Sequence, residues 1–224
     1  MRPLPPRSEP APLLTFAALM LCAACADEPG REAPRDRIAR AASSLSGPVL
    51  EQALDAFDCA TRRGELERPT LAVIDFSRSS LAERLWLIDV DTAEVVRMRV
   101  THGQGSGGLW ATAFSNESGS RQSSLGLYRA AEAYVGEHGR SLRLDGLEPV
   151  NDRARDRSIV IHAAEYATLR YALLHGHLGR SWGCPAVAPD VSDRLIDALE
   201  GGGAVFAWYP DERWLSGSAY LRCK

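Results

Sequence analysis

The sequence lacks an excess of positive charge. Of its 224 residues, 26 are Lys or Arg and 29 are Asp or Glu, which gives a formal net charge of −3. Proteins that bind nucleic acid through its phosphates need a basic surface, so the charge balance argues against a nucleic-acid partner. Apolar residues make up 45% of the chain and charged residues 25%, as in ordinary globular proteins. The length allows one domain with a sizeable core and an appendage.

A long membrane-spanning run is also lacking near the N-terminus. The uncharged residues 11–26 follow Arg2 and Arg7, and charge resumes at Asp27. This stretch is too short for a comfortable membrane span. A basic start, a short apolar middle and small residues before the first acid are typical of an export signal, rather than of a buried core helix. We therefore predict that residues 1–26 form an export signal.

Two cleavage patterns compete within this predicted signal. Residues 24–26 read Ala-Cys-Ala and fit an A-x-A cleavage site, whereas residues 21–25 resemble a bacterial lipobox that would lipidate Cys25. Cys22 stands where a lipobox prefers an aliphatic residue. We favour the lipoprotein, which contacts a membrane only through this N-terminal anchor. Either pattern predicts an exported protein, periplasmic or anchored to the outer membrane, in an oxidising part of the cell envelope.

Cysteine is scarce beyond the predicted signal. Only Cys59, Cys184 and Cys223 remain there, and an odd number leaves at least one free thiol. We expect Cys184 to be the free one. Cys59 and Cys223 either pair, tying an N-terminal helix to the end of the chain, or stay separate, and the sequence leaves both alternatives open.

The apolar pattern predicts an α+β domain dominated by sheet. Residues 27–66 are predicted as a tether and a helix, with the polar tether reaching residue 47, and residues 67–224 as the main domain. Asp190 is a candidate N-cap for the last predicted helix, and Gly201–Gly203 would end it. Short polar turns between the first three strands predict an antiparallel meander. Strands are predicted over 71–76, 84–90, 94–100, 141–146, 158–162 and 204–209, and helices over 48–63, 165–174 and 189–200.

A cysteine motif carries the candidate chemistry. Residues 179–187 read Gly-Arg-Ser-Trp-Gly-Cys-Pro-Ala-Val, and His162 ends an apolar run 22 residues before Cys184. A thiol attacks carbonyl groups as the thiolate, so it needs a neighbour that takes its proton, and a histidine from another strand is the usual one. We therefore predict Cys184 as nucleophile and His162 as general base. The alternative is a buried, inert thiol.

Other residues of the motif are assigned to binding and positioning. Gly183 permits a tight turn that would aim backbone N–H groups at an oxyanion, and Ser181 and Trp182 are grouped with it as positioning residues. The imidazole would be oriented by Ser181 or by a backbone carbonyl. Arg180 is predicted to hold a substrate carboxylate, since its fork matches that geometry.

A glycine- and serine-rich segment lies between residues 102 and 126. It lacks the Lys-Ser/Thr pair and the helix of a phosphate-binding loop. We predict that it lines a polar concavity for a peptide or sugar-peptide, with His102 and Ser123 binding substrate; a mobile loop is the alternative.

Rival assignments involve the other histidines. His175 and His177 lie close to Cys184 in sequence, but a glycine-flanked loop favours surface roles for both. Together with His162 and Cys184 they could ligate zinc, but a site with one thiolate and no nearby acid is unusual. We therefore expect no metal and no cofactor.

The ordered motifs resemble the murein L,D-transpeptidase catalytic domain family, in its subgroup whose active-site motif ends in Gly-Cys-Pro-Ala. The similarity runs from about residue 71 to residue 218. It includes the segments 73–77, 84–86, 102–107, 114–116, 123–126, 136–139, 141–146, 159–162 and 179–187.

The resemblance implies a fold and a reaction. It implies a β-sandwich-like catalytic domain without metal, in which Cys184 is the nucleophile, His162 is the base, and the amides near Gly183 and Cys184 form the oxyanion hole. In such enzymes the thiolate attacks the carbonyl on the L-centre of diaminopimelate in a peptidoglycan tetrapeptide stem, and D-alanine leaves. The thioester then passes to an amine, giving a 3→3 cross-link or an attached acceptor, or to water. Carbapenems would acylate Cys184.

The sequence departs from the family pattern at two places. The family often has glycine after the histidine, where this chain has Ala163, and its commonest members carry a different sequence around the nucleophile. The prediction is an L,D-transpeptidase acting on peptidoglycan stem peptides. The alternatives are an L,D-carboxypeptidase, in which water is the acceptor, and a catalytically silent lipoprotein that binds the cell wall.

Overall fold

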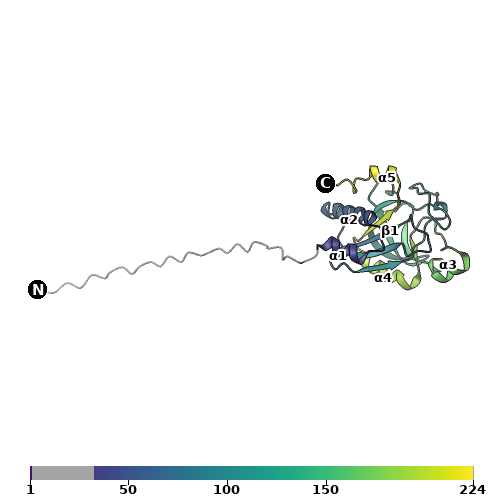
Figure 1. Ribbon diagram of the computed structural model, residues 1–224, viewed down its shortest axis with the longest axis horizontal. Coiled ribbons are helices and arrows are strands. Elements are labelled where there is room, and N and C mark those ends of the chain that lie inside the picture. The colour runs from purple at the N-terminus through teal and green to yellow at the C-terminus, as the bar shows by residue number, and fades with distance from the viewer. Residues whose placement is uncertain (2–32, 224) are drawn as a thin grey trace. The chain divides into compact units, whose positions relative to one another are not determined.

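Eight strands pair edge to edge in the order β3-β2-β1-β8-β4-β5-β6-β7. In the computed structural model, which describes Met1 and residues 33–223, helices cover this sheet (Figure 1). The predicted sheet-dominated α+β fold is confirmed. The strands are β1 Thr70–Asp75, β2 Leu85–Asp89, β3 Val95–Met98, β4 Gly126–Gly136, β5 Gly139–Gly146, β6 Val160–Ala163, β7 Ala186–Val187 and β8 Ala204–Trp208.

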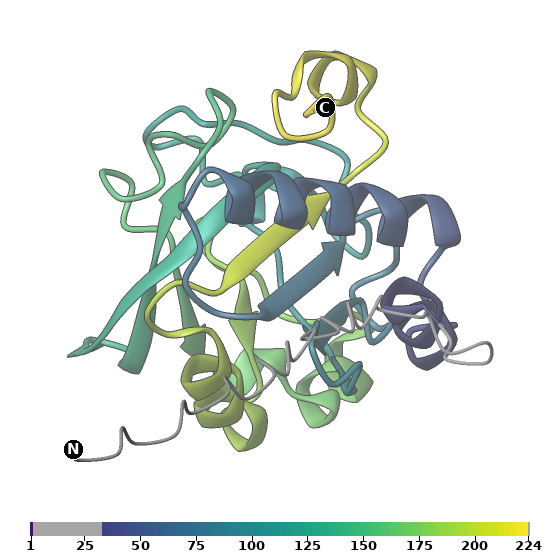
Figure 2. The ribbon, with the colours of Figure 1, turned by 90° about the vertical axis from the view of Figure 1, so that its left-hand side faces the viewer.

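The first three strands form the predicted antiparallel meander, with β1 paired to β2 and β2 to β3. On its other side β1 runs parallel to β8. All six residues of β1 are buried, because the helix α2 (Gly47–Arg62) packs against β1 and β8 while α4 (Pro189–Leu199) packs against β1, β5 and β6. Figure 2 shows α2 lying across β1 and β8. The central strands therefore read as continuous apolar runs.

The sheet nearly closes on itself. The backbone N–H of Thr101, just after β3, donates to the carbonyl of Ala186 in β7 at 2.9 Å, and Gly103 forms a parallel bridge with Ser181. The two edge strands of the sheet are thus linked through the segment that follows β3. The sandwich-like domain implied by the resemblance takes the form of one curled sheet. The contacts that close it involve Ser181 and Ala186, which lie on either side of Cys184 in the sequence.

The N-terminal helices differ in part from the prediction. The helix α2 agrees with the expected 48–63, and it buries apolar residues at helical spacing. However, part of the predicted tether is helical: α1 spans Pro34–Ala41 and buries Ile38. Arg35 in α1 bonds both Asp55 and Asp58 of α2. Both helices belong to the same compact unit as the sheet.

Several further elements differ from the prediction. The long strand β4 and the short strand β7 were not predicted, and neither was the helix α5 (Glu212–Gly217). The helix expected over 165–174 is divided into a 3₁₀ turn, Glu165–Ala167, and α3, Leu169–His175, with the Thr168 side chain capping the second part. Asp190 is not an N-cap: α4 begins at Pro189, and Asp190 lies in its first turn.

The cysteine assignments are confirmed for the described residues. Cys59 and Cys223 form a disulfide, and Cys184 is free. The predicted export signal, including Cys25 and both cleavage patterns, lies outside the described residues apart from Met1 and stays a prediction. No helix within the described ranges is long and apolar enough to cross a membrane.

Candidate active site

Strand register brings the predicted nucleophile and base to one cavity. His162 in β6 pairs with Ala186 in β7, and Cys184 lies two residues before Ala186. Side chains two residues apart on a strand share a face, so Val160 and His162 of β6 face the same side. These two residues, Cys184 and Ser158, which precedes the strand, line a cavity of about 460 Å³. The other residues that line it are Tyr134, Glu137, His138, Arg157, Tyr166, Arg180, Ser181 and Trp182.

The Cys184 thiol is neutral in its surroundings. Its Sγ lies 3.5 Å from the carbonyl oxygen of Ser158, which can only accept a hydrogen bond, so the thiol donates to it. Burial raises the pKa of Cys184 above its usual value, while the backbone N–H of Val160 and the guanidinium of Arg157 pull the pKa downward. The resting sulfur is thus a thiol that needs a base to ionise it.

The His162 ring has a fixed tautomer. Its Nδ1 lies 2.9 Å from the carbonyl oxygen of Ala163. Because that oxygen only accepts, the neutral ring carries its proton on Nδ1 and leaves the lone pair on Nε2. A backbone carbonyl, rather than Ser181, therefore orients the imidazole. Burial is the main cause that lowers the pKa of His162, and nearby His138 lowers it further. His162 is thereby kept in its basic, uncharged form.

His138 is a site residue that the sequence did not single out. It lies in the tight turn between β4 and β5, and its ring stacks on His162 with the centroids 4.4 Å apart. By contrast, the sequence rivals His175 and His177 do not line the cavity, and each bonds a backbone carbonyl through Nδ1. No group of three or more His, Cys, Asp or Glu side chains is placed to hold a metal ion in residues 33–223.

Ser181 and Ser123 hold the nucleophile loop from two sides. The Ser181 hydroxyl accepts from the N–H of Gly183 at 3.0 Å and donates to the carbonyl of Cys184 at 2.6 Å. The Ser123 hydroxyl donates to the carbonyl of Gly183 at 3.0 Å and accepts from the N–H of Gly103 at 3.1 Å. The Gly183 amide is therefore already bonded within the loop, so its predicted part in an oxyanion hole would require it to give up the bond to Ser181.

Ser123 and His102, which were predicted to bind substrate, are buried and do not line the cavity of Cys184. Ser123 is 3% exposed and His102 is 1% exposed. His102 accepts at Nδ1 from the guanidinium of Arg84, 2.7 Å away, and its carbonyl accepts from the N–H of Ser181. Burial and Arg84 lower the pKa of His102 to about 4. Ser123 and His102 of the glycine- and serine-rich segment thus hold the cysteine motif through hydrogen bonds, and neither residue lines the cavity.

Arg157 is the second site residue that the sequence analysis missed. Its guanidinium donates to the carbonyls of Ser115 and Gln122 at 2.8 and 2.6 Å, and to the hydroxyl of Ser124 at 2.7 Å. It lines the cavity and contributes positive charge near Cys184. No local motif marks it, because its partners come from a segment more than thirty positions earlier.

Arg180 and Trp182 lie where a substrate could meet them. Both line the cavity, and Trp182 is 68% exposed, with the guanidinium of Arg121 over its ring. One Arg180 nitrogen donates to the carbonyl of Gly107 at 3.0 Å, which leaves its other N–H groups for a ligand. Tyr166 forms another part of the wall, and burial together with Cys184 raises the pKa of its phenol to about 12.

A comparison with known protein families identifies the family of the domain. Residues 41–208 match the L,D-transpeptidase catalytic domain. The chain belongs to this family. The family expected from the sequence motifs is thus confirmed, and the match covers both α2 and every strand of the sheet. The family match ends with β8, so α5 and the residues after it lie beyond the matched range.

Solved L,D-transpeptidases resemble the chain at low identity. The enzyme from Mycobacterium smegmatis is 12% identical over 63% of this chain and 59% of its own, with a TM-score of 0.38. L,D-transpeptidase 1 from Mycobacterium tuberculosis is 14% identical over 62% and 60%, with a TM-score of 0.35. The enzyme from Stackebrandtia nassauensis is 12% identical over 80% and 75%, with a TM-score of 0.39. The chain thus spans about three-fifths of the two mycobacterial proteins. Among curated proteins, none matches the sequence.

Gly183 gives the first prediction for this L,D-transpeptidase domain. It has a φ of +127°, and a Cβ there would lie 2.7 Å from the carbonyl oxygen of Gln122. We expect Gly183→Ala to displace the cysteine loop, to lower the free energy of unfolding by ~1–3 kcal/mol, and to slow the reaction of Cys184 with a thiol reagent. Thermal unfolding and alkylation rates measure the two effects. Gly108→Ala is the matched control, because no heavy atom lies within 4 Å of a Cβ there; equal behaviour of both variants would contradict the prediction.

Proposed function

We propose that the protein is a cysteine L,D-transpeptidase that acts on peptidoglycan stem peptides through a thioester acyl-enzyme. One observation carries the proposal: the free thiol of Cys184 and the neutral imidazole of His162 line the same cavity, in a chain of the L,D-transpeptidase family. A silent wall-binding protein is less well supported, because Cys184 is neither in a disulfide nor fully buried.

The proposed acylation uses Nε2 of His162 as general base. It takes the proton of Cys184 as Sγ forms its bond to the carbonyl carbon of the stem peptide. The bond from that carbon to the nitrogen of D-alanine then breaks, and the proton passes from His162 to the leaving amine. In the second half, an acceptor amine attacks the thioester, loses its proton to His162, and releases the thiol. Water in place of the amine would give the carboxypeptidase reaction.

Several groups support binding of the peptide and of the developing charge. Because the Gly183 amide is bonded to Ser181, the guanidinium of Arg157 is the group we assign to stabilise negative charge near Sγ. Arg180 is our proposed partner for a stem-peptide carboxylate, and the exposed Trp182 is proposed to cover an apolar part of the substrate. A cavity of about 460 Å³ is of a size that accommodates part of a peptide.

The proposed place of action is the cell envelope. The predicted export signal and the Cys59–Cys223 disulfide both support an oxidising compartment, since structural disulfides persist there. In the lipoprotein alternative, a lipid on Cys25 would anchor the enzyme to the membrane near its substrate, and the other cleavage pattern would release it into the periplasm.

A carbapenem adduct is the decisive test of the proposed chemistry. The intact folded protein is incubated with a carbapenem, and we expect mass spectrometry to show one added molecule of drug, mapped to Cys184. Cys184→Ala should gain none. A folded protein without the adduct would overturn the proposal. Product analysis with muropeptides then identifies the acceptor: cross-linked dimers indicate transpeptidation, and trimmed tripeptides indicate hydrolysis.

A further inference from the structure

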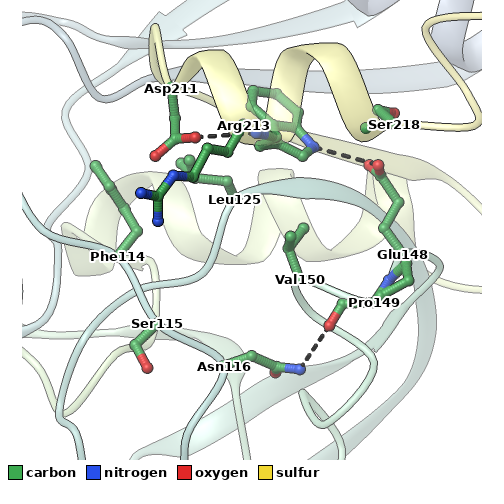
Figure 3. Close-up of a pocket in the computed structure, with 12 residues that line it drawn as sticks. Phe114, Ser115, Asn116, Leu125, Glu148, Pro149, Val150, Asp211, Arg213 and Ser218 are labelled. Carbon is green, nitrogen blue, oxygen red and sulfur yellow. Dashed lines mark hydrogen bonds between the residues drawn. The ribbon is translucent and has the colours of Figure 1, made fainter.

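We propose that a second cavity, separate from the one at Cys184, binds a zwitterionic apolar α-amino acid or dipeptide. This cavity has a volume of about 450 Å³ and lies between the segment 114–116, the turn 148–150 and α5 (Figure 3). Its floor and sides are apolar. Phe114, Leu125, Pro149, Val150 and Trp214 form them. The volume is within the range of small-molecule sites, and the aromatic and aliphatic lining suits an apolar side chain.

Most polar groups around this second cavity are already satisfied. Glu148 is 3% exposed, and its two carboxylate oxygens accept from the N–H of Leu127 and from Nε1 of Trp214. The Asn116 amide donates to the carbonyl of Pro149 at 3.1 Å and to Asp152 at 2.7 Å. These groups shape the wall and have little capacity left for a ligand.

Arg213 and Asp211 are the exceptions. The guanidinium of Arg213 makes no hydrogen bond or ion pair within the described part of the chain. Asp211 uses Oδ1 to accept from the N–H of Trp214 at 2.9 Å, and its other oxygen has no bond among the described residues. Figure 3 shows the Arg213 side chain reaching from α5 toward Phe114, on the same side of the cavity as the Asp211 carboxylate.

Two opposite charges with unused bonding capacity define the kind of ligand. A simple carboxylate would pair with Arg213 but would also face Asp211, and a simple amine would meet the reverse conflict. A ligand that carries both an ammonium and a carboxylate group satisfies both side chains at once, because charge-assisted hydrogen bonds form at each end. Its apolar side chain would then lie against the lining of the cavity. An apolar amino acid or dipeptide has this combination.

The second cavity adjoins the Cys184 cavity, so a test must separate them. The carbonyl of Ser115, which lines the second cavity, accepts from Arg157, which lines the cavity of Cys184. The proposed binding does not depend on the proposed catalysis. Binding to protein whose Cys184 has been alkylated with iodoacetamide therefore reports on the second cavity, whatever the outcome of the carbapenem experiment.

Calorimetric titration of the whole protein with phenylalanine, in both enantiomers, tests the proposal. We expect saturable binding that survives alkylation of Cys184. N-acetyl-phenylalanine lacks the ammonium group and phenylalaninamide lacks the carboxylate, so each should bind about tenfold more weakly than phenylalanine. Absence of saturable binding, or loss of binding after alkylation of Cys184, would overturn the proposal.

Two charge-removing variants assign each end of the ligand. Arg213→Gln should weaken phenylalanine binding about tenfold but should not weaken the binding of phenylalaninamide, because that ligand has no carboxylate to pair with Arg213. Asp211→Asn, which keeps the oxygen that accepts from Trp214, should weaken phenylalanine binding about tenfold but should not weaken the binding of N-acetyl-phenylalanine, because that ligand has no ammonium group to pair with Asp211. Arg194→Gln, at an exposed arginine on α4, is the matched control. Equal effects of all three variants would contradict the assignment.

Discussion

His162→Asn is expected to slow the acylation of Cys184 by ~10²–10⁴-fold at neutral pH, the range found for a general base. Burial raises the pKa of Cys184 and lowers the pKa of His162, so the resting pair is a thiol and an imidazole. The thiolate must then form as the carbonyl is attacked, with His162 taking the proton. Asparagine can still donate to the carbonyl of Ala163, but it offers no base.

The pH dependence separates this mechanism from a preformed ion pair. For the wild-type protein, the acylation rate should be flat between the two pKa values and should fall as the pH drops through the pKa of His162, below 6.5. For His162→Asn, the rate should rise about tenfold per pH unit toward the raised pKa of Cys184, because only the thiolate fraction reacts. His138, Glu137, Arg157 and Tyr166 also line this cavity, and of these His138 lowers the pKa of His162 while Arg157 lowers the pKa of Cys184.

The measurement is the rate of carbapenem acylation from pH 5 to pH 9. His175→Asn is the matched control, because His175 is exposed, bonds a backbone carbonyl in the same way, and does not line the cavity. We expect it to leave the rate and the profile unchanged. An unchanged rate in His162→Asn, or a rate that falls equally in both variants, would refute the role of His162 as base.

The strands that were predictable are those whose pattern reflects burial on both sides. β1 and β8 are continuous apolar runs because helices and neighbouring strands cover them, and such runs are visible in a sequence. β4 escaped prediction although it is the longest of the described strands. It is rich in alanine, and a register shift between Ala130 and Ala133 interrupts the alternation that would mark a strand. Its pairing with β5 and β8 is therefore a tertiary effect.

The two residues of the proposed chemistry can be picked out in the sequence, but the residues around them cannot. Cys184 and His162 stand in recognisable local contexts, a tight turn and the end of a strand. His138 and Arg157 reach the same cavity from a hairpin turn and from the approach to β6, and only the strand pairing brings them together. His102 illustrates the opposite case. Its residue type suggests a contact with substrate, whereas the fold buries it against the loop that carries Cys184.

Removing the Cys59–Cys223 disulfide should have the largest effect on stability. The bond closes a loop with a sequence separation of 164 residues. Cross-linking so long a loop restricts the unfolded chain, and the chain-entropy relation gives ~5 kcal/mol at this length. We therefore expect Cys59→Ala/Cys223→Ala to lose ~4–5 kcal/mol of unfolding free energy and ~10–20 °C in Tm. Denaturant and thermal unfolding followed by circular dichroism measure both losses.

Native contacts near the bond should not rescue the variant. The guanidinium of Arg63 lies over the Tyr220 ring, and the Tyr220 hydroxyl donates to Glu65 at 2.8 Å, so the C-terminal segment is held beside α2 in other ways as well. These contacts act on the folded state, whereas the disulfide acts mainly on the unfolded one, and the two contributions are therefore separate. Carbapenem acylation at 25 °C should stay at the wild-type rate, since neither cysteine lines the Cys184 cavity. Cys184→Ala is the control, because it removes a thiol without opening the loop that the disulfide closes. A loss of unfolding free energy below ~1 kcal/mol in the double variant would contradict the prediction, and would show that the unfolded chain is already restricted without the bond.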